Sequence, residues 1–92
     1  MISFRKPLLV GKSLIHRKLR TVRRIKAGKM CNNVFLITDP TNPANLFDVI
    51  EEKVLLFPYY SERDIFVHGI AGSIGEAQEM LLKLTEEKYA GS

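Results

Sequence analysis

The chain has 92 residues, 46% of them hydrophobic, and carries a formal net charge of +4 at pH 7. Its length suits one compact domain, and its longest apolar run, VLLFPYY, is far shorter than the roughly 20 residues of a membrane-spanning helix. One cysteine excludes an internal disulfide, and the PLLV stretch is too short for a secretory signal peptide. We therefore expect a single domain over residues 1 to 92, located in the cytoplasm.

The charge is divided unevenly along the chain. Residues 1 to 38 carry ten basic side chains and no acidic one, whereas residues 39 to 92 carry four basic and ten acidic side chains. The formal charges of the two segments are therefore +10 and −6. Such asymmetry indicates either an acidic partner or neutralisation of one segment by the other.

The first third of the chain predicts a strand and a helix. Residues 1 to 12 contain ISFRKPLLV, whose internal proline is typical of an edge strand or an extended arm. Residues 13 to 27 predict a helix, because their apolar side chains recur at spacings of three and four. Ser13 is the expected N-cap, and Gly28 the expected left-handed residue at the C-terminal end.

The middle of the chain predicts a buried strand and a second helix. Residues 34 to 38, VFLIT, are apolar and β-branched and precede Asp-Pro, as expected for a strand. The segment TNPANLFDVIEE then offers Asn42 as an N-cap and Pro43 at the first helical position. The next segment, KVLLFPYYSERD, fits either a brief strand or an irregular packed segment.

The last third predicts a strand over residues 64 to 68 and a helix that ends near Lys88. Ser73 and Glu76 form a capping box at the beginning of this helix. The alternation of strands and helices favours a small α/β domain with about three strands, including a parallel pair, and three helices packed on the sheet.

The segment YYSERDIFVHGIAGSIGEA, residues 59 to 77, resembles short uncharacterised bacterial proteins. These proteins have no assigned function, and the segment holds no catalytic motif. The resemblance therefore implies a bacterial source and adds no activity.

The helix predicted within residues 13 to 29 has a strongly basic face. Its basic residues are Arg17, Lys18, Arg20, Arg23, Arg24 and Lys26. One interpretation is that the acidic pairs at 51–52 and 86–87 neutralise this face, within one copy or across a dimer. Another is that it binds nucleic acid through the phosphates, without reading sequence. An anionic membrane surface is a weaker alternative, because the apolar face lacks Trp and Phe anchors.

A second candidate site depends on the strand arrangement. If the strands ending at Thr38 and His68 are parallel neighbours, their carboxyl ends meet at one edge of the sheet, where α/β domains bind ligands. The residues gathered there would be Thr38, Asp39, His68, Gly69, Gly72 and Ser73. Together with the N-terminus of the last helix they would bind a small anion. The alternative is that the glycines permit a tight turn and that Ser73 only caps the helix.

Catalytic and metal-binding residues are sparse. Cys31 and His68 are expected at opposite edges of the sheet, so they do not form a nucleophile and base pair. One cysteine and two histidines are too few for a metal site. The sequence thus favours a protein that is not an enzyme and that holds no metal or cofactor.

A group of aromatic residues lies at a proline bend. Phe57, Tyr59 and Tyr60 fit either a protein interface or a cap on the small core. The interpretation that accounts for most features is a small non-catalytic interaction domain that self-associates as a homo-oligomer. Its alternatives are sequence-nonspecific binding of nucleic acid, an acidic protein partner, and a small anionic ligand at the strand ends.

Overall fold

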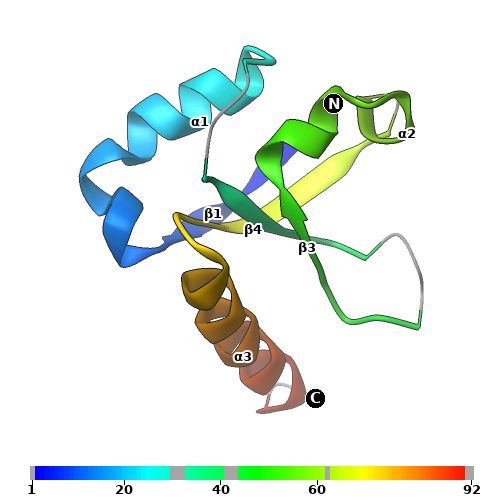
Figure 1. Cartoon of the computed structure of the whole chain (residues 1–92). Helices are drawn as coiled ribbons and strands as arrows, with labels where there is room; N and C mark the ends of the chain where they lie inside the picture. Colours follow the sequence, from blue (N-terminus) through cyan, green and yellow to red (C-terminus); the bar gives the residue numbers. More distant parts are fainter. Residues whose placement is uncertain (1, 30–32, 41–43, 62, 91–92) are drawn as a thin grey trace.

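The structure is a computed structural model that describes residues 2–29, 33–40, 44–61 and 63–90, and within these ranges the chain forms a four-stranded mixed sheet (Figure 1). The strands are β1 (Ile2–Val10), β2 (Phe35–Thr38), β3 (Asp48–Glu51) and β4 (Ile65–Ala71), in the spatial order β1-β4-β2-β3. β1 runs parallel to β4, whereas β2 pairs antiparallel with both β4 and β3. β4 is therefore paired along both edges, while β1 and β3 are the edge strands.

A helical segment follows each of the two parallel strands. After β1, the 3-10 helix η1 (Lys12–Arg17) leads directly into α1 (Lys18–Lys26). After β4, the chain enters α3 (Ile74–Ala90). Between β3 and β4 lie a second 3-10 helix, η2 (Glu52–Leu56), and a single helical turn, α2 (Pro58–Ser61).

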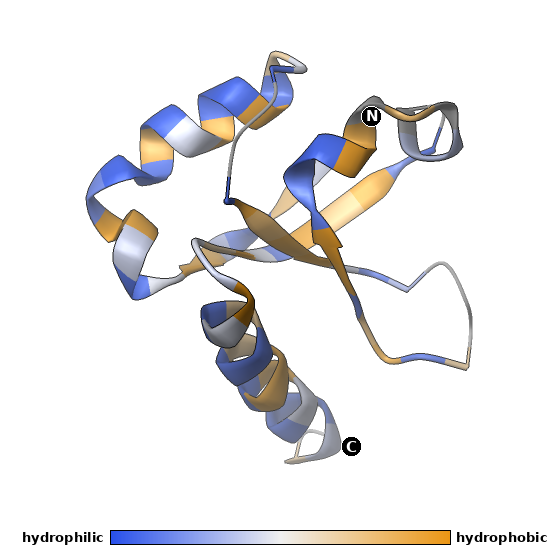
Figure 2. Cartoon of the chain, viewed as in Figure 1, coloured by the Kyte–Doolittle hydropathy of each residue, from blue (hydrophilic) through white to orange (hydrophobic). Residues whose placement is uncertain are grey.

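The sheet buries side chains on both of its faces. Leu36 and Ile37 are neighbours in β2 and are both 0% exposed, and successive strand residues point to opposite faces. On one face, Leu36 belongs to a core cluster with Ile25 of α1 and Val67 of β4. On the other face, Ile37 packs with Met80 of α3. The molecule therefore has three layers, with α1 and η2 on one side of the sheet and α3 on the other (Figure 1), and the strands β2 and β4 are mostly hydrophobic (Figure 2).

The predicted α/β class and the presence of a parallel pair are confirmed, but the element counts are wrong. The described residues form four strands rather than three, and two α-helices longer than one turn rather than three. The helix predicted from TNPANLFDVIEE is replaced over residues 48–51 by β3, which pairs with β2. Val49 and Ile50 are β-branched and suit a strand, and tertiary pairing outweighs the helical spacing. Asn42 and Pro43 lie outside the described residues.

The expected ends of the other two helices are largely confirmed. Gly28 has a φ of +74°, the left-handed conformation expected after α1. At α3, the Ser73 hydroxyl accepts a hydrogen bond from the Glu76 backbone N–H at 3.2 Å, so Ser73 caps the helix. Only this half of the predicted capping box forms, because the Glu76 carboxylate accepts from the Gly72 backbone N–H rather than from that of Ser73. Ser13 does not act as an N-cap, because the helical segment begins as a 3-10 helix at Lys12 and the Ser13 side chain bonds to Glu76 of α3 instead.

Two positions on α1 test whether this helix is anchored to the sheet. Ile25 is 1% exposed in the core cluster, whereas Leu19 is 69% exposed on the same helix. We expect Ile25→Ala to lower the free energy of unfolding by about 2–5 kcal/mol, because it leaves a cavity under α1. Leu19→Ala is the matched control and should change it by less than about 0.5 kcal/mol. Urea unfolding of dilute protein measures both values, and equal effects would contradict this packing.

Candidate functional site

The outward side of α1 carries most of the charge predicted for it. Thr21 and Ile25 are buried toward the sheet. At about 100° per residue, the opposite side of the helix presents Leu19, Arg20 and Arg23. We name the basic residues of this segment the basic face. They are Arg17, Lys18, Arg20, Arg23, Arg24 and Lys26.

Half of the basic face has no local counter-charge. Within the described ranges, Lys18, Arg20 and Arg23 make no hydrogen bond or ion pair through their side chains. Arg17 donates to the Ser13 carbonyl at 3.2 Å, and the Lys26 ammonium lies 5.5 Å from the centre of a β1 aromatic ring. Neither contact removes positive charge from the surface.

Three of the four acidic residues expected to neutralise this face are paired elsewhere or buried. Glu51 pairs with Lys53 at 3.1 Å, and Glu87 pairs with Arg5 at 3.4 Å. Glu52 is 1% exposed, so it presents no charge at the surface. Neutralisation within one copy is therefore not seen for Lys18, Arg20 and Arg23.

Two large apolar side chains are exposed along the same helical segment. Ile15 of η1 is 56% exposed, and Leu19 of α1 is 69% exposed. Leu19 is four positions after Ile15, and it directly precedes Arg20. The surface thus combines apolar contact area with unpaired positive charge.

The outward side of α3 has the opposite charge. Ala77, Met80 and Leu84 are buried toward the sheet. The opposite side of this helix carries two exposed acids and two exposed apolar residues, which we name the acidic stripe. Its residues are Glu79, Leu82, Glu86 and Tyr89.

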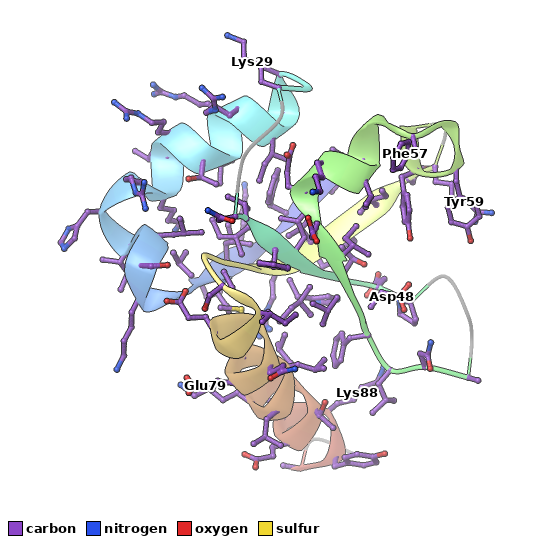
Figure 3. All side chains as sticks on the ribbon, in the orientation of Figure 1. Lys29, Asp48, Phe57, Tyr59, Glu79 and Lys88 are labelled. Carbon is purple, nitrogen blue, oxygen red and sulfur yellow. The ribbon has the colours of Figure 1, made fainter. Side chains whose placement is uncertain are left out.

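The acidic stripe is accessible and mixed in character. Leu82 is 61% exposed and Tyr89 is 68% exposed. Glu79 and Glu86 form no ion pair within the described ranges, and Glu79 projects outward from α3 (Figure 3). The residue types for this stripe are visible in the sequence at spacings of three, four and three, on the side of α3 opposite to its buried apolar residues.

The expected parallel pairing of the strands ending at Thr38 and His68 is wrong. β2 and β4 are antiparallel, with Thr38 opposite Val67. This register still places Asp39 beside His68, and the carboxylate Oδ1 lies 2.6 Å from the imidazole Nε2. The other three members of the predicted cluster are Gly69, Gly72 and Ser73.

Gly69 directly follows His68 in β4, but it has a structural role, as do Gly72 and Ser73 at the beginning of α3. A Cβ atom at Gly69 would collide with the Met80 sulfur, so this glycine permits the close approach of α3 to the sheet. Gly72 and Ser73 follow the carboxyl end of β4, where α3 begins. The structure therefore separates the predicted anion site into two places.

At the beginning of α3, an anion is already supplied by the chain itself. The Glu76 carboxylate accepts hydrogen bonds from the Gly72 backbone N–H at 3.0 Å and from the Ser13 hydroxyl at 2.9 Å. It also accepts from the Ser13 backbone N–H at 3.3 Å. These bonds, the Gly72 bond foremost, together with nearby Lys12, hold the pKa of Glu76 below its ordinary value.

The aromatic residues at the proline bend divide between core and surface. Tyr60 packs against the core cluster on the α1 side of the sheet. Phe57 is 61% exposed and Tyr59 is 52% exposed, at one corner of the molecule (Figure 3). The Arg63 guanidinium lies 4.3 Å from the centre of the Tyr59 ring.

Four further features of the sequence concern two single residues, a metal site and a membrane-spanning helix. His16 is exposed on η1, and Cys31 lies outside the described residues. Among the residues that the structure describes, no three His, Cys, Asp or Glu side chains gather into a metal-binding group. None of the helices in the described segments is long and apolar enough to cross a membrane.

Comparison of the chain with models of known protein families, with curated proteins and with solved structures gives no match.

The Glu76 contacts predict how stability depends on pH. Because the pKa of Glu76 is lowered from its ordinary value of 4.5, its contribution is complete above that pH and is lost as the pH falls through the lower, folded value. Glu76→Gln should therefore destabilise the protein at pH 7 and much less near pH 3, in urea unfolding experiments. An equal loss of stability at both pH values would show that the charge of Glu76 is not responsible.

Proposed function

We propose that this protein is a small interaction domain that self-associates by docking the basic face of one copy onto the acidic stripe of the next. The observation that carries the proposal is that Lys18, Arg20 and Arg23 have no ion pair within the described ranges, while Leu19 is exposed among them. A partner for this surface must offer both negative charge and apolar area. The acidic stripe of the same chain offers both.

The two surfaces match in composition. On α1, Leu19 lies beside Arg20 and Arg23, and on α3, Leu82 lies between Glu79 and Glu86. Apolar side chains at the centre with charged side chains around them are typical of protein interfaces. Opposite charges on the two sides would fix the register and speed association, more than they would add affinity.

The position of the two helices determines the kind of assembly. α1 and α3 lie on opposite faces of the sheet, so one copy cannot bring its own two surfaces together. Contact between unlike surfaces of successive copies is head to tail, and it leaves one surface of each kind open at the ends. The assembly therefore grows with concentration unless the geometry closes it into a ring.

A charge exchange between the two surfaces tests the proposal. We expect Arg20→Glu with Arg23→Glu to abolish self-association, because both helices then present acidic surfaces. Glu79→Lys with Glu86→Lys should do the same through two basic surfaces. An equimolar mixture of the two variants should associate again, as measured by light scattering after size-exclusion chromatography at low salt.

A matched control separates the surface from net charge. Lys6→Glu with Lys53→Glu makes the same change in net charge as Arg20→Glu with Arg23→Glu, but away from α1 and α3, and this variant should associate like the original protein. If the mixture of the two exchanged variants stays monomeric, or if the control also dissociates, the proposed contact is wrong.

Binding of nucleic acid is the second candidate function, and it is favoured by the same unpaired side chains of α1. Several cations along three turns of a helix contact successive phosphates and release counterions. Helix α1 carries no aromatic residue for base stacking, so the binding would be independent of sequence. This candidate leaves the exposed Leu19 and the whole acidic stripe without a role.

The second candidate predicts binding with a steep dependence on salt. Fluorescence anisotropy with labelled oligonucleotides should show an affinity that falls about a thousandfold between about 50 and 200 mM salt if six or more phosphates are contacted. Arg20→Ala with Arg23→Ala should weaken it, while Glu79→Lys with Glu86→Lys should not. An absence of binding at low salt would exclude this candidate.

A further inference from the structure

A pocket around His68 lies on the sheet face that α3 covers, and none of its lining residues belongs to the basic face or to the acidic stripe. Its volume is about 420 Å³. Phe47, Phe66 and Leu84 form its apolar wall. The pocket therefore offers flat apolar surface next to a histidine.

The imidazole of His68 is held in one orientation. Its side chain is 16% exposed, and its Nε2 lies 2.6 Å from the Asp39 carboxylate. Because a carboxylate only accepts, Nε2 carries the proton of this bond. The rings of Phe47 and Phe66 meet the imidazole edge to face, with centroids at 5.1 and 5.0 Å. Orientation is therefore fixed from three sides.

In the neutral imidazole, the second ring nitrogen of His68, Nδ1, carries no proton and acts as a hydrogen-bond acceptor. Within the described ranges, His68 makes no hydrogen bond other than the one with Asp39. A fixed polar atom beside apolar walls is the arrangement by which small-molecule pockets orient a ligand.

Two cations line the same pocket. Arg5 contributes from β1. Lys88, which is labelled in Figure 3, contributes from the end of α3. The Lys88 ammonium lies 5.4 Å from the centre of the Phe47 ring. Arg5 is held by Glu87 at 3.4 Å, but the Glu87 side chain is 59% exposed, and pairs of this kind are weak enough for an anion to displace.

We infer that the His68 pocket binds a small organic anion, a carboxylate or a phosphate ester that carries a flat apolar group. The apolar group lies against Phe47 and Phe66, and the anionic group lies between Arg5 and Lys88. His68, whose Nε2–H is directed to Asp39, contributes a ring in a fixed orientation beside the apolar group. Asp39 and Glu87 are the two carboxylates of the pocket, and they disfavour ligands with extended negative charge.

The two histidines of the chain make a direct test. His68 reports on the pocket, and His16, exposed on η1, reports on nonspecific attraction of anions to the basic segment. NMR signals of both rings are followed while the full chain is titrated with phenyl phosphate or with benzoate. Phenol, which lacks the anion, and inorganic phosphate, which lacks the ring, are the comparison probes.

We expect saturable shifts of the His68 signals with at least one aromatic anion, and weaker effects of phenol and inorganic phosphate. A response to phenyl phosphate alone assigns the pocket to phosphate esters, and a response to benzoate alone assigns it to carboxylates. Lys88→Gln should raise the dissociation constant about tenfold, the effect of one lost charge-assisted hydrogen bond. Lys83→Gln, on the same helix but outside the pocket, should leave it unchanged.

Three results would overturn the inference. They are the absence of a His68 shift with either aromatic anion up to about 10 mM, shifts confined to His16, and equal weakening by Lys83→Gln and Lys88→Gln.

Discussion

The pairing of β4 along both of its edges is the constraint on which the rest of the structure depends. β1 joins it in parallel and β2 joins it antiparallel, so its side chains are buried on both faces of the sheet. This arrangement needs a cover on each face, and α1 and α3 supply the two covers. The strongly basic helix and the more acidic helix are consequently held on opposite sides of the sheet. Because their outward surfaces cannot neutralise each other within one copy, we place the counter-charge on another molecule.

Local signals in the sequence predicted the parts of the fold that depend on a few neighbouring residues. The Ser73 cap of α3 and the left-handed Gly28 both follow from the chemistry of one residue and its position. The strand β3 was wrongly predicted as helix, because a short segment with apolar residues at mixed spacings satisfies both patterns. Only its pairing with β2, a tertiary contact, decides between them. The sequence also did not predict that β1 is the parallel partner of β4, because the order of strands in a sheet depends on contacts between distant segments.

The candidate sites show the same division. The basic residues of α1 were identifiable because charge is read directly from composition. The pairing of Glu76 with Ser13 was not, since these residues are 63 positions apart and meet only where the parallel strands β1 and β4 end together. The Glu76 carboxylate occupies the position where an external anion was expected, so the ligand site that we propose lies at His68 and not at the beginning of α3. There, the antiparallel register of β2 and β4 brings Asp39 to the imidazole.

If unlike surfaces of successive copies meet, sedimentation velocity of the unmodified protein detects their association. Measured over a range of concentrations at low salt, the sedimentation coefficient should rise steadily with concentration, because head-to-tail contact leaves open ends. Added salt should reverse this rise by screening the charges that bring the surfaces together. A single monomeric species at every concentration would contradict the account, as would an oligomer whose size is independent of salt.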